Sequence, residues 1–218
     1  MTGARTAIFS LIRGNLAASA PFDAEHHYEQ AVTLARSGSE AASVLETFAL
    51  SLEAVGASCA IVDSESAAAD RLREIVTALA AKEIVISDAP LVHRLIDAAG
   101  LDAVAEPSRK ELFASDLGVT TAQWAIAETG TLVLEAGAER HRLVSLVPPV
   151  HVCVLNASAI RQSMGEILEK LDVDANPAIT FITGASRTSD IELTLAIGVH
   201  GPGELYVIVI KDQTAASV

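Results

Sequence analysis

The sequence is short of cysteine: Cys59 and Cys153 are the only two among 218 residues, and each stands alone in an apolar run. No CxxC pair occurs, whereas iron–sulfur clusters and zinc knuckles need several closely spaced cysteines. Sites of both kinds are therefore excluded on this chain. The pattern predicts two reduced, buried thiols, as in a cytosolic protein.

Aromatic residues make up only 4% of the chain, so its core must be built mainly from Ala, Val, Leu and Ile. No apolar run approaches the ~18 residues of a membrane-spanning helix, and Arg13 interrupts the N-terminal run that superficially resembles a signal peptide. Basic residues are also few, and the formal net charge of −13 argues against nucleic acid or an anionic membrane as partner. We expect a cytoplasmic protein without membrane insertion.

The first 36 residues are predicted to form a helical extension. Residues 4–18 place apolar side chains at helical spacing, and a polar connector follows them. Residues 37–218 are of the right length for one α/β domain.

The first half of that domain alternates between strand-like and helix-like segments. A helix over 41–56 with Ser39 as a candidate N-cap precedes two strands and two further helices. The strands are expected at 58–63 and 83–88, and the helices at 66–81 and 89–100. This alternation predicts βαβ units, a parallel sheet and right-handed crossovers.

The second half has a different character. Two apolar runs, 124–136 and 142–156, are separated by a short polar segment, which predicts a hairpin-type connection. A helix over 158–172 and strands over 178–184 and 205–210 follow, whereas residues 191–200 satisfy both the helix and the strand pattern. The predicted fold class is α/β, with a mixed, largely parallel sheet flanked by helices.

A first polar cluster, Glu128-Thr129-Gly130-Thr131, interrupts an apolar run. A glycine permits an exposed backbone turn, and a carboxylate beside it can serve as base, nucleophile or hydrogen-bond acceptor in a cleft. The alternative is a β-bulge that leaves Glu128 on the solvated face of an edge strand.

A second cluster spans residues 183–192. Gly184 permits close backbone approach, Ser186 and Thr188 are good capping residues, and Arg187 adds a planar cation, which together suit a carboxylate or phosphate. The sequence contains no P-loop pattern. The alternative is a capped loop in which Arg187 pairs with Asp190 or Glu192.

Histidines form the third candidate group. His200 precedes a Gly-Pro-Gly turn that would hold it at a strand end, and His151 stands at the head of an apolar strand, where we expect it to face the core. Neither belongs to a metal-ligand spacing, and no GxSxG motif supports serine hydrolase chemistry.

Three segments together closely resemble the LutC/YkgG family of lactate-utilisation proteins, which are built on a LUD domain. They are "AIAETGTLVL" (125–134), "LVPPVHVCVL" (146–155) and "FITGASRTSDIELTLAIGVHGP" (181–202). The resemblance covers nearly the whole chain. It implies a fold like that of the NagB/RpiA/CoA-transferase group and a role in oxidising L-lactate to pyruvate. It also implies partner proteins that carry the iron–sulfur clusters, with no cofactor bound by this chain.

The resemblance further implies a pocket for a small anionic ligand, with Glu128 and His200 as catalytic groups and no metal. The ligand-binding residues would be Thr129, Gly130, Thr131, Gly184, Ser186, Arg187, Thr188, Asp190 and Glu192. We hypothesise that Glu128 interrupts its strand because it faces a cleft, and that Gly130 lets the chain turn so that Arg187 reaches the same ligand.

Two other hypotheses stay open. The "AETG" segment is similar to the Ser-Glu-Asn-Gly turn of CoA transferases, with Thr129 in place of Asn. A stand-alone transferase-like or sugar-phosphate-isomerase-like enzyme would use Glu128 as nucleophile or base. A ligand-sensing or scaffold protein would need no catalytic residue. Self-association into a homo-oligomer is open under each hypothesis.

Overall fold

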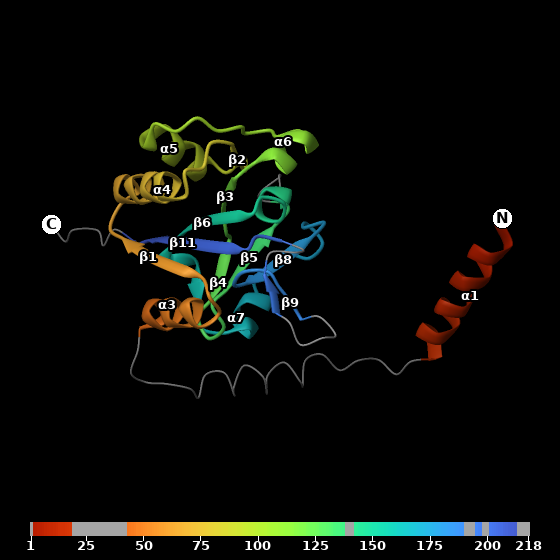
Figure 1. The fold of residues 1–218 in the computed structure, drawn as a ribbon. Coiled ribbons are helices and arrows are strands. Elements are labelled where there is room, and N and C mark those ends of the chain that lie inside the picture. The colour runs from red at the N-terminus through yellow and green to blue at the C-terminus, as the bar shows by residue number, and fades with distance from the viewer. Residues whose placement is uncertain (1, 19–42, 138–141, 190–194, 198–200, 213–218) are drawn as a thin grey trace.

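The computed structural model describes residues 2–18, 43–137, 142–189, 195–197 and 201–212 (Figure 1). Helix α1 (Thr2–Ala18) confirms the predicted N-terminal helix. Residues 19–42 lie outside the described part, so the division of the chain at residue 36 stays a prediction. No helix among the described ranges is long and apolar enough to cross a membrane.

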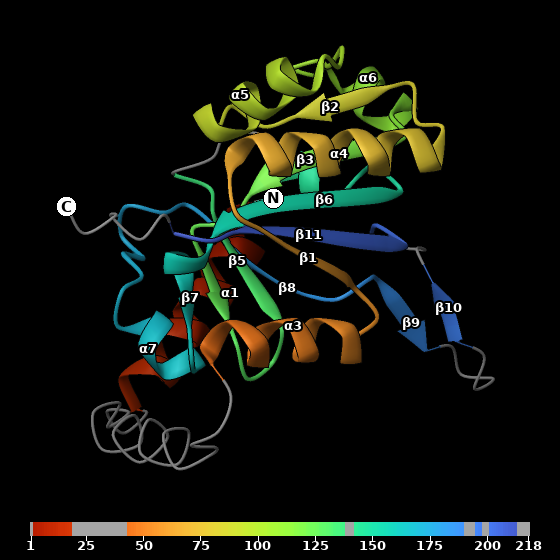
Figure 2. The same cartoon turned by 90° about the vertical axis from the view of Figure 1, so that its left-hand side faces the viewer.

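A five-stranded parallel sheet forms the centre of the domain, in the order β1-β11-β6-β3-β2. Its strands are β1 (Ser58–Val62), β2 (Ile84–Ile86), β3 (Leu117–Thr121), β6 (Val150–Asn156) and β11 (Glu204–Ile210). The last strand, β11, lies between β1 and β6, so distant parts of the chain are neighbours in the sheet (Figure 2). The predicted parallel sheet is confirmed.

Antiparallel pairs lie outside this sheet. A second sheet has the order β7-β4-β5-β8, and a separate ribbon pairs β9 with β10. Their bounds are β4 (Trp124–Ile126), β5 (Thr131–Glu135), β7 (Ile160–Arg161), β8 (Ile179–Thr183), β9 (Arg187–Ser189) and β10 (Leu195–Ile197). The ambiguous segment 191–200 is thus a strand at Leu195–Ile197, and its other residues lie outside the described part.

The predicted hairpin is wrong in its location. The run 124–136 is not one strand but the β4–β5 hairpin itself, which turns at residues 127–130. The run 142–156 begins with a 3₁₀ turn, η1 (Arg142–Ser145), and its strand β6 pairs with β3 and β11 in the other sheet. A parallel strand buried on both faces has a continuous apolar pattern, which resembles that of a hairpin partner.

The helices cover the central sheet from both sides (Figures 1 and 2). One face packs against α4 (Glu65–Leu79) and α5 (Pro90–Ala99), and the other against α3 (Val44–Ala54) and the second sheet. Strand β6 shows the alternation directly. Val152 and Val154 belong to the core beneath α4 and α5, whereas Cys153 and Leu155 belong to the core on the α3 side.

Capping residues set several helix boundaries. Ser43 and Glu46 form a capping box that starts α3, so its N-cap is Ser43 and not Ser39 as predicted. The helix predicted over 158–172 is wrong for most of its length. It reduces to α7 (Met164–Leu168), because Ser163 caps that helix and the preceding residues form the 3₁₀ turn η2 (Ala157–Ala159) and strand β7. The short helix α6 (Arg109–Ala114) lies between α5 and β3 in the chain, and Ser108 caps it.

Candidate functional site

The "AETG" segment forms the tight turn between β4 and β5. Gly130 ends this turn in the left-handed region, with a φ of 63°. A Cβ on Gly130 would lie 2.6 Å from the backbone of Ser51 and Leu52 in α3. The glycine therefore permits a turn that packs directly on the helix backbone.

The first two polar clusters meet through three hydroxyl groups. Thr131 on β5 lies opposite Thr183 on β8. The Thr131 hydroxyl oxygen is 2.7 Å from that of Thr129 and 2.8 Å from that of Thr183. Segments more than 50 residues apart in sequence are thereby joined immediately before the loop that begins at Gly184.

Glu128 is exposed at the β4–β5 turn and contacts α7. Its Oε1 accepts a hydrogen bond of 3.1 Å from the backbone N–H of Met164, the first residue of that helix. Its own N–H donates to the carbonyl of Gln162. Glu128 is not among the residues that line the two cavities described below. Its catalytic role stays a prediction.

The loop after β8 packs against the end of α3. Gly184, with a φ of 77°, leaves no room for a Cβ beside the Val55 carbonyl. Arg187 Nη2 donates a 3.0 Å hydrogen bond to that same carbonyl, which places a cation at a helix C-terminus. Thr188 lies in β9. Asp190, Glu192 and His200 lie outside the described residues, so their predicted roles stay predictions.

Gly184, Ser186 and Arg187 line a cavity of about 310 Å³, which we call the amino-edge cavity because it lies beside the first residues of β6 and β11. Its other lining residues are Ser145, Leu146, His151, Thr180, Phe181, Ile182, Thr183, Ala185, Gly201, Pro202 and Leu205. Three of the predicted ligand-binding residues therefore line the same cavity.

His151 gives this cavity an unusual polar group. The imidazole is 1% exposed, and its Nε2 lies 2.8 Å from the Thr120 hydroxyl. Its Nδ1 is buried and has no hydrogen-bond partner within the part of the chain that the structure describes. Burial lowers the pKa of His151 from 6.5 to about 3, so the ring is neutral at physiological pH. The expectation that His151 faces the core is correct, but its place on a cavity wall was not predicted.

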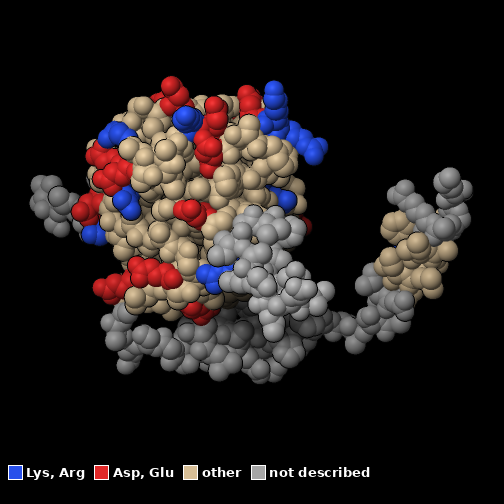
Figure 3. Space-filling view, in the orientation of Figure 1, with Lys and Arg blue, Asp and Glu red and all other residues tan. Residues whose placement is uncertain are grey.

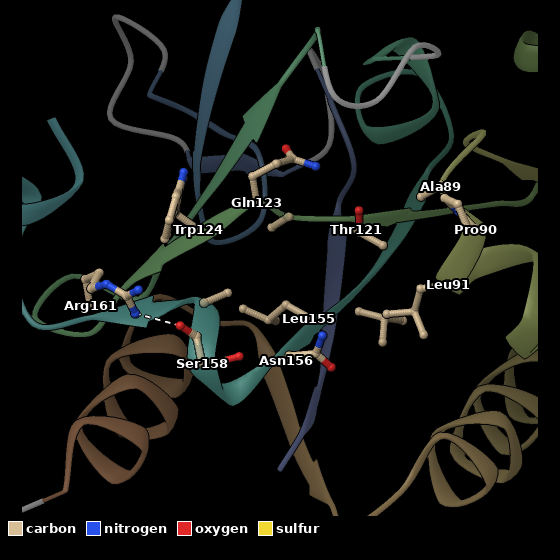
Figure 4. Close-up of a pocket in the computed structure, with 13 residues that line it drawn as sticks. Ala89, Pro90, Leu91, Thr121, Gln123, Trp124, Leu155, Asn156, Ser158 and Arg161 are labelled. Carbon is tan, nitrogen blue, oxygen red and sulfur yellow. Dashed lines mark hydrogen bonds between the residues drawn. The ribbon is translucent and has the colours of Figure 1, made fainter. Parts of the chain in front are cut away.

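A second cavity, of about 520 Å³, lies where β3 and β6 end and α5 begins (Figure 4). We call it the carboxyl-edge cavity because it lies at the carboxyl ends of these parallel strands. Open α/β sheets bind their ligands at this edge. It is lined by Ala89, Pro90, Leu91, Thr121, Ala122, Gln123, Trp124, Val154, Leu155, Asn156, Ser158, Ala159 and Arg161. This cavity was not predicted from the sequence, although polar residues directly after two buried strands are a signal of such an edge.

The two cysteines lie in the central sheet. Cys59 on β1 and Cys153 on β6 both pair with Val207 of the intervening strand β11. Two strand spacings, roughly 10 Å, separate them, too far for a disulfide. Burial and the nearby Glu53 carboxylate raise the pKa of Cys59 to about 11. Within the described ranges, no three His, Cys, Asp or Glu side chains are grouped to hold a metal ion.

The surface charges are interspersed rather than segregated on the face shown in Figure 3. Several are paired: Arg94 bonds Glu65 through two nitrogens, and Arg73 bonds Asp70. The Arg94 guanidinium lowers the pKa of Glu65. Such exposed pairs contribute little to stability.

Comparison with known proteins gives a family match over most of the domain. Residues 45–210 match the family model described as LUD domain. An uncharacterized protein of Neisseria meningitidis serogroup B is 37% identical over 150 residues, which cover 67% of this chain and 64% of that protein. Lactate utilization protein C of Deinococcus radiodurans is 41% identical over 106 residues, covering 47% of this chain and 50% of that protein. The matched segments therefore span only part of these relatives.

Escherichia coli YkgG, an uncharacterized protein, is 36% identical over 102 residues and 44% of each chain. A crystal structure of a DUF162 family protein from Deinococcus radiodurans superimposes with a TM-score of 0.57 and 27% identity. That match covers 77% of this chain and 96% of the solved one.

Proposed function

This chain belongs to the LUD domain family, and on that premise we propose that it is a subunit or accessory of an iron–sulfur system that oxidises L-lactate to pyruvate. Several relatives carry the name lactate utilization protein C, which supports a role in lactate utilisation. Since the matches span about half of those proteins, the complete reaction and its partners belong to the proposal.

The proposed division of labour follows from the chemistry. Oxidation of L-lactate to pyruvate releases two electrons and two protons, and the electrons need a carrier. This chain has two cysteines in all, fewer than the four that usually hold an iron–sulfur cluster. We therefore assign the clusters to partner proteins, and to this chain the binding of a small anionic ligand without a redox centre of its own.

The amino-edge cavity is the proposed place for that ligand. One observation carries this assignment: His151, whose buried Nδ1 has no hydrogen-bond partner among the described residues, lines this cavity together with Ser186 and Arg187. A buried polar atom without a partner costs about 1–3 kcal/mol, which a bound oxygen atom would relieve. The Thr120 hydroxyl can donate to Nε2, which leaves Nδ1–H as a donor toward a carboxylate.

Arg187 would supply the positive charge that binds the ligand's carboxylate. Its guanidinium is anchored by one nitrogen to the Val55 carbonyl, and its side chain is otherwise exposed. A neutral imidazole donor and a guanidinium together suit a single carboxylate of lactate or pyruvate. The volume of about 310 Å³ is at the small end of ligand cavities.

Affinity purification from the native host grown on L-lactate tests the proposal. A tagged chain should recover iron-containing proteins and L-lactate oxidation. The Arg187→Gln variant should recover the same partners but lower the oxidation rate. Arg94→Gln removes another exposed arginine, which lies in α5 and does not line the amino-edge cavity, and should change neither. Recovery of an iron-free, inactive protein would refute the proposed role and favour a stand-alone enzyme.

A further inference from the structure

We propose that the carboxyl-edge cavity is a second binding site, for an organic anion larger than lactate whose oxyanion group is held by Arg161. This site shares no lining residue with the amino-edge cavity. It rests on a different cation, a different edge of the sheet and a different set of contacts, so it stands independently of the function proposed above.

Arg161 is fixed by the protein backbone and keeps one edge open. Its Nη1 donates to the carbonyl of Ser158 at 2.6 Å (Figure 4) and to that of Ile160 at 2.8 Å. The contacts found among the described residues do not engage Nε or Nη2, nor do they pair Arg161 with a carboxylate. The Nε–Nη2 edge presents two parallel N–H groups, the geometry that binds carboxylate or phosphate oxygens in pairs.

The backbone of Arg161 is equally constrained. Strand β7 pairs with β4, which places Arg161 beside Ile126. The Arg161 carbonyl also accepts a hydrogen bond of 2.8 Å from the N–H of Ala127. A guanidinium anchored at both its main chain and Nη1 loses less freedom on binding than a surface arginine does.

Trp124 forms the wall behind this cation. The guanidinium carbon of Arg161 lies 5.1 Å from the centre of the indole ring, and Lys170 Nζ lies 5.6 Å from it. The indole N–H donates to Glu135 at 2.8 Å, which fixes the ring. The Glu135 carboxylate also accepts a hydrogen bond of 2.6 Å from the side-chain amide of Asn176. Arg161 and Lys170 bring two positive charges to the ring and Glu135 brings one negative charge, so the local balance is positive and favours an anion despite the net charge of the chain.

The remaining walls suit the body of a larger molecule. Leu91, Leu155 and Ala159 contribute apolar surface, and Asn156 adds a polar side chain at the end of β6. The opposite side is the start of α5, where Ala89 supplies no side-chain cap. A volume of about 520 Å³ exceeds what lactate needs and falls in the range of cofactor-sized ligands.

Trp124 is the only tryptophan in the sequence and lines this cavity, so the indole signals come from one known position beside the proposed site. The intact chain would be titrated with ADP, an organic phosphate, with hexanoate, an organic carboxylate, and with L-lactate. Indole fluorescence and the single indole N–H resonance would be followed together. We expect ADP or hexanoate to perturb both signals, and which of them does so identifies the oxyanion as phosphate or carboxylate.

Arg161→Gln should weaken that binding by about 10-fold or more, the loss expected for one charge-assisted pair. Arg187→Gln should leave it unchanged, and an unchanged denaturation midpoint shows that each variant is folded. Absence of a response to ADP and hexanoate, or equal binding by Arg161→Gln, would overturn the proposal. A response to L-lactate alone would also overturn it, because the cavity would then hold the small ligand. Lactate-dependent activity is scored separately, so the two proposals fail independently.

Discussion

Thr131 and Thr183 face each other across strands β5 and β8, and their hydroxyl oxygens lie 2.8 Å apart. Thr131 is almost completely buried and also contacts the hydroxyl of Thr129. Through this chain of hydroxyls the β4–β5 turn and the loop at Gly184 form one unit. Both glycines at its ends pack on the last turns of α3. The unit that sequence patterns mark most strongly is therefore a packing junction beside a cavity.

The hydroxyl chain should contribute measurably to stability. We expect Thr131→Val to lower the free energy of unfolding by about 1 kcal/mol, because it removes both contacts while conserving volume. The Thr131→Val/Thr183→Val double mutant should lose less than the sum of the single variants, since the partners interact directly. Thr77, whose hydroxyl bonds a carbonyl of its own helix α4, supplies the control. Thr77→Val and Thr183→Val should be additive in urea denaturation, and additivity of the Thr131 pair would contradict the linkage.

Two glycines allow the packing of the turn to be separated from its backbone conformation. Gly130 and Gly100 have nearly equal φ values, 63° and 64°, but only Gly130 lies against another segment. Gly100→Ala should cost about 1 kcal/mol, the penalty of the left-handed conformation alone. Gly130→Ala should cost at least about 2 kcal/mol more, because its Cβ meets the α3 backbone. Equal losses in parallel denaturant titrations would show that α3 yields to the added methyl group.

The sequence predicted the alternating first half of the domain because local periodicity determines it. The β1–α4–β2–α5 order depends on apolar spacing within each segment and on caps and glycines at their ends. The β4–β5 hairpin was missed for the opposite reason. The polar turn within 124–136 was interpreted as an interruption of one strand, and the partners of β6 are strands β3 and β11, which are distant in sequence.

The candidate sites also combine features that local sequence predicts with contacts that only distant segments make. Gly130, Gly184 and Arg187 were marked by their residue types, but their shared contact, the end of α3, lies about 80 residues or more upstream and has no signature. Arg161 was overlooked because its segment has a helical pattern, whereas the structure places it in β7. Its value as a binding group depends on Trp124 and on two backbone carbonyls, which only the folded chain assembles.

Glu128 offers a direct test between capping and chemistry. Glu128→Gln should leave the free energy of unfolding unchanged, since an amide oxygen can still accept the hydrogen bond from Met164 N–H. Glu128→Ala removes that acceptor and should cost about 0.5–1 kcal/mol. Because the Gln variant is matched in shape and stability, its growth on L-lactate reports on the carboxylate itself. The catalytic role predicted for Glu128 requires that growth to fail, and full growth would leave the cap as its role.

The buried imidazole of His151 should make stability depend on pH. Its pKa is about 3 in the folded chain and near 6.5 when unfolded. Between these values the unfolded chain binds one proton more, so stability is complete above pH 6.5 and falls as the pH is lowered. The expected slope approaches about 1.4 kcal/mol per pH unit near pH 5. Carboxyl groups with lowered pKa values, such as Glu65 and Asp116, act at lower pH.

Urea denaturation at intervals from pH 5 to pH 7 measures this slope. His151→Gln removes the titrating group while keeping a polar atom near Thr120. It should remove the contribution of one proton to the dependence of the free energy of unfolding on pH. Thr120→Val removes the hydrogen bond to Nε2 but leaves the ring buried, so it should lower stability at every pH with the slope retained. An unchanged slope in His151→Gln would mean that the imidazole gains a proton without unfolding, and that the cavity beside it admits water or a counter-ion.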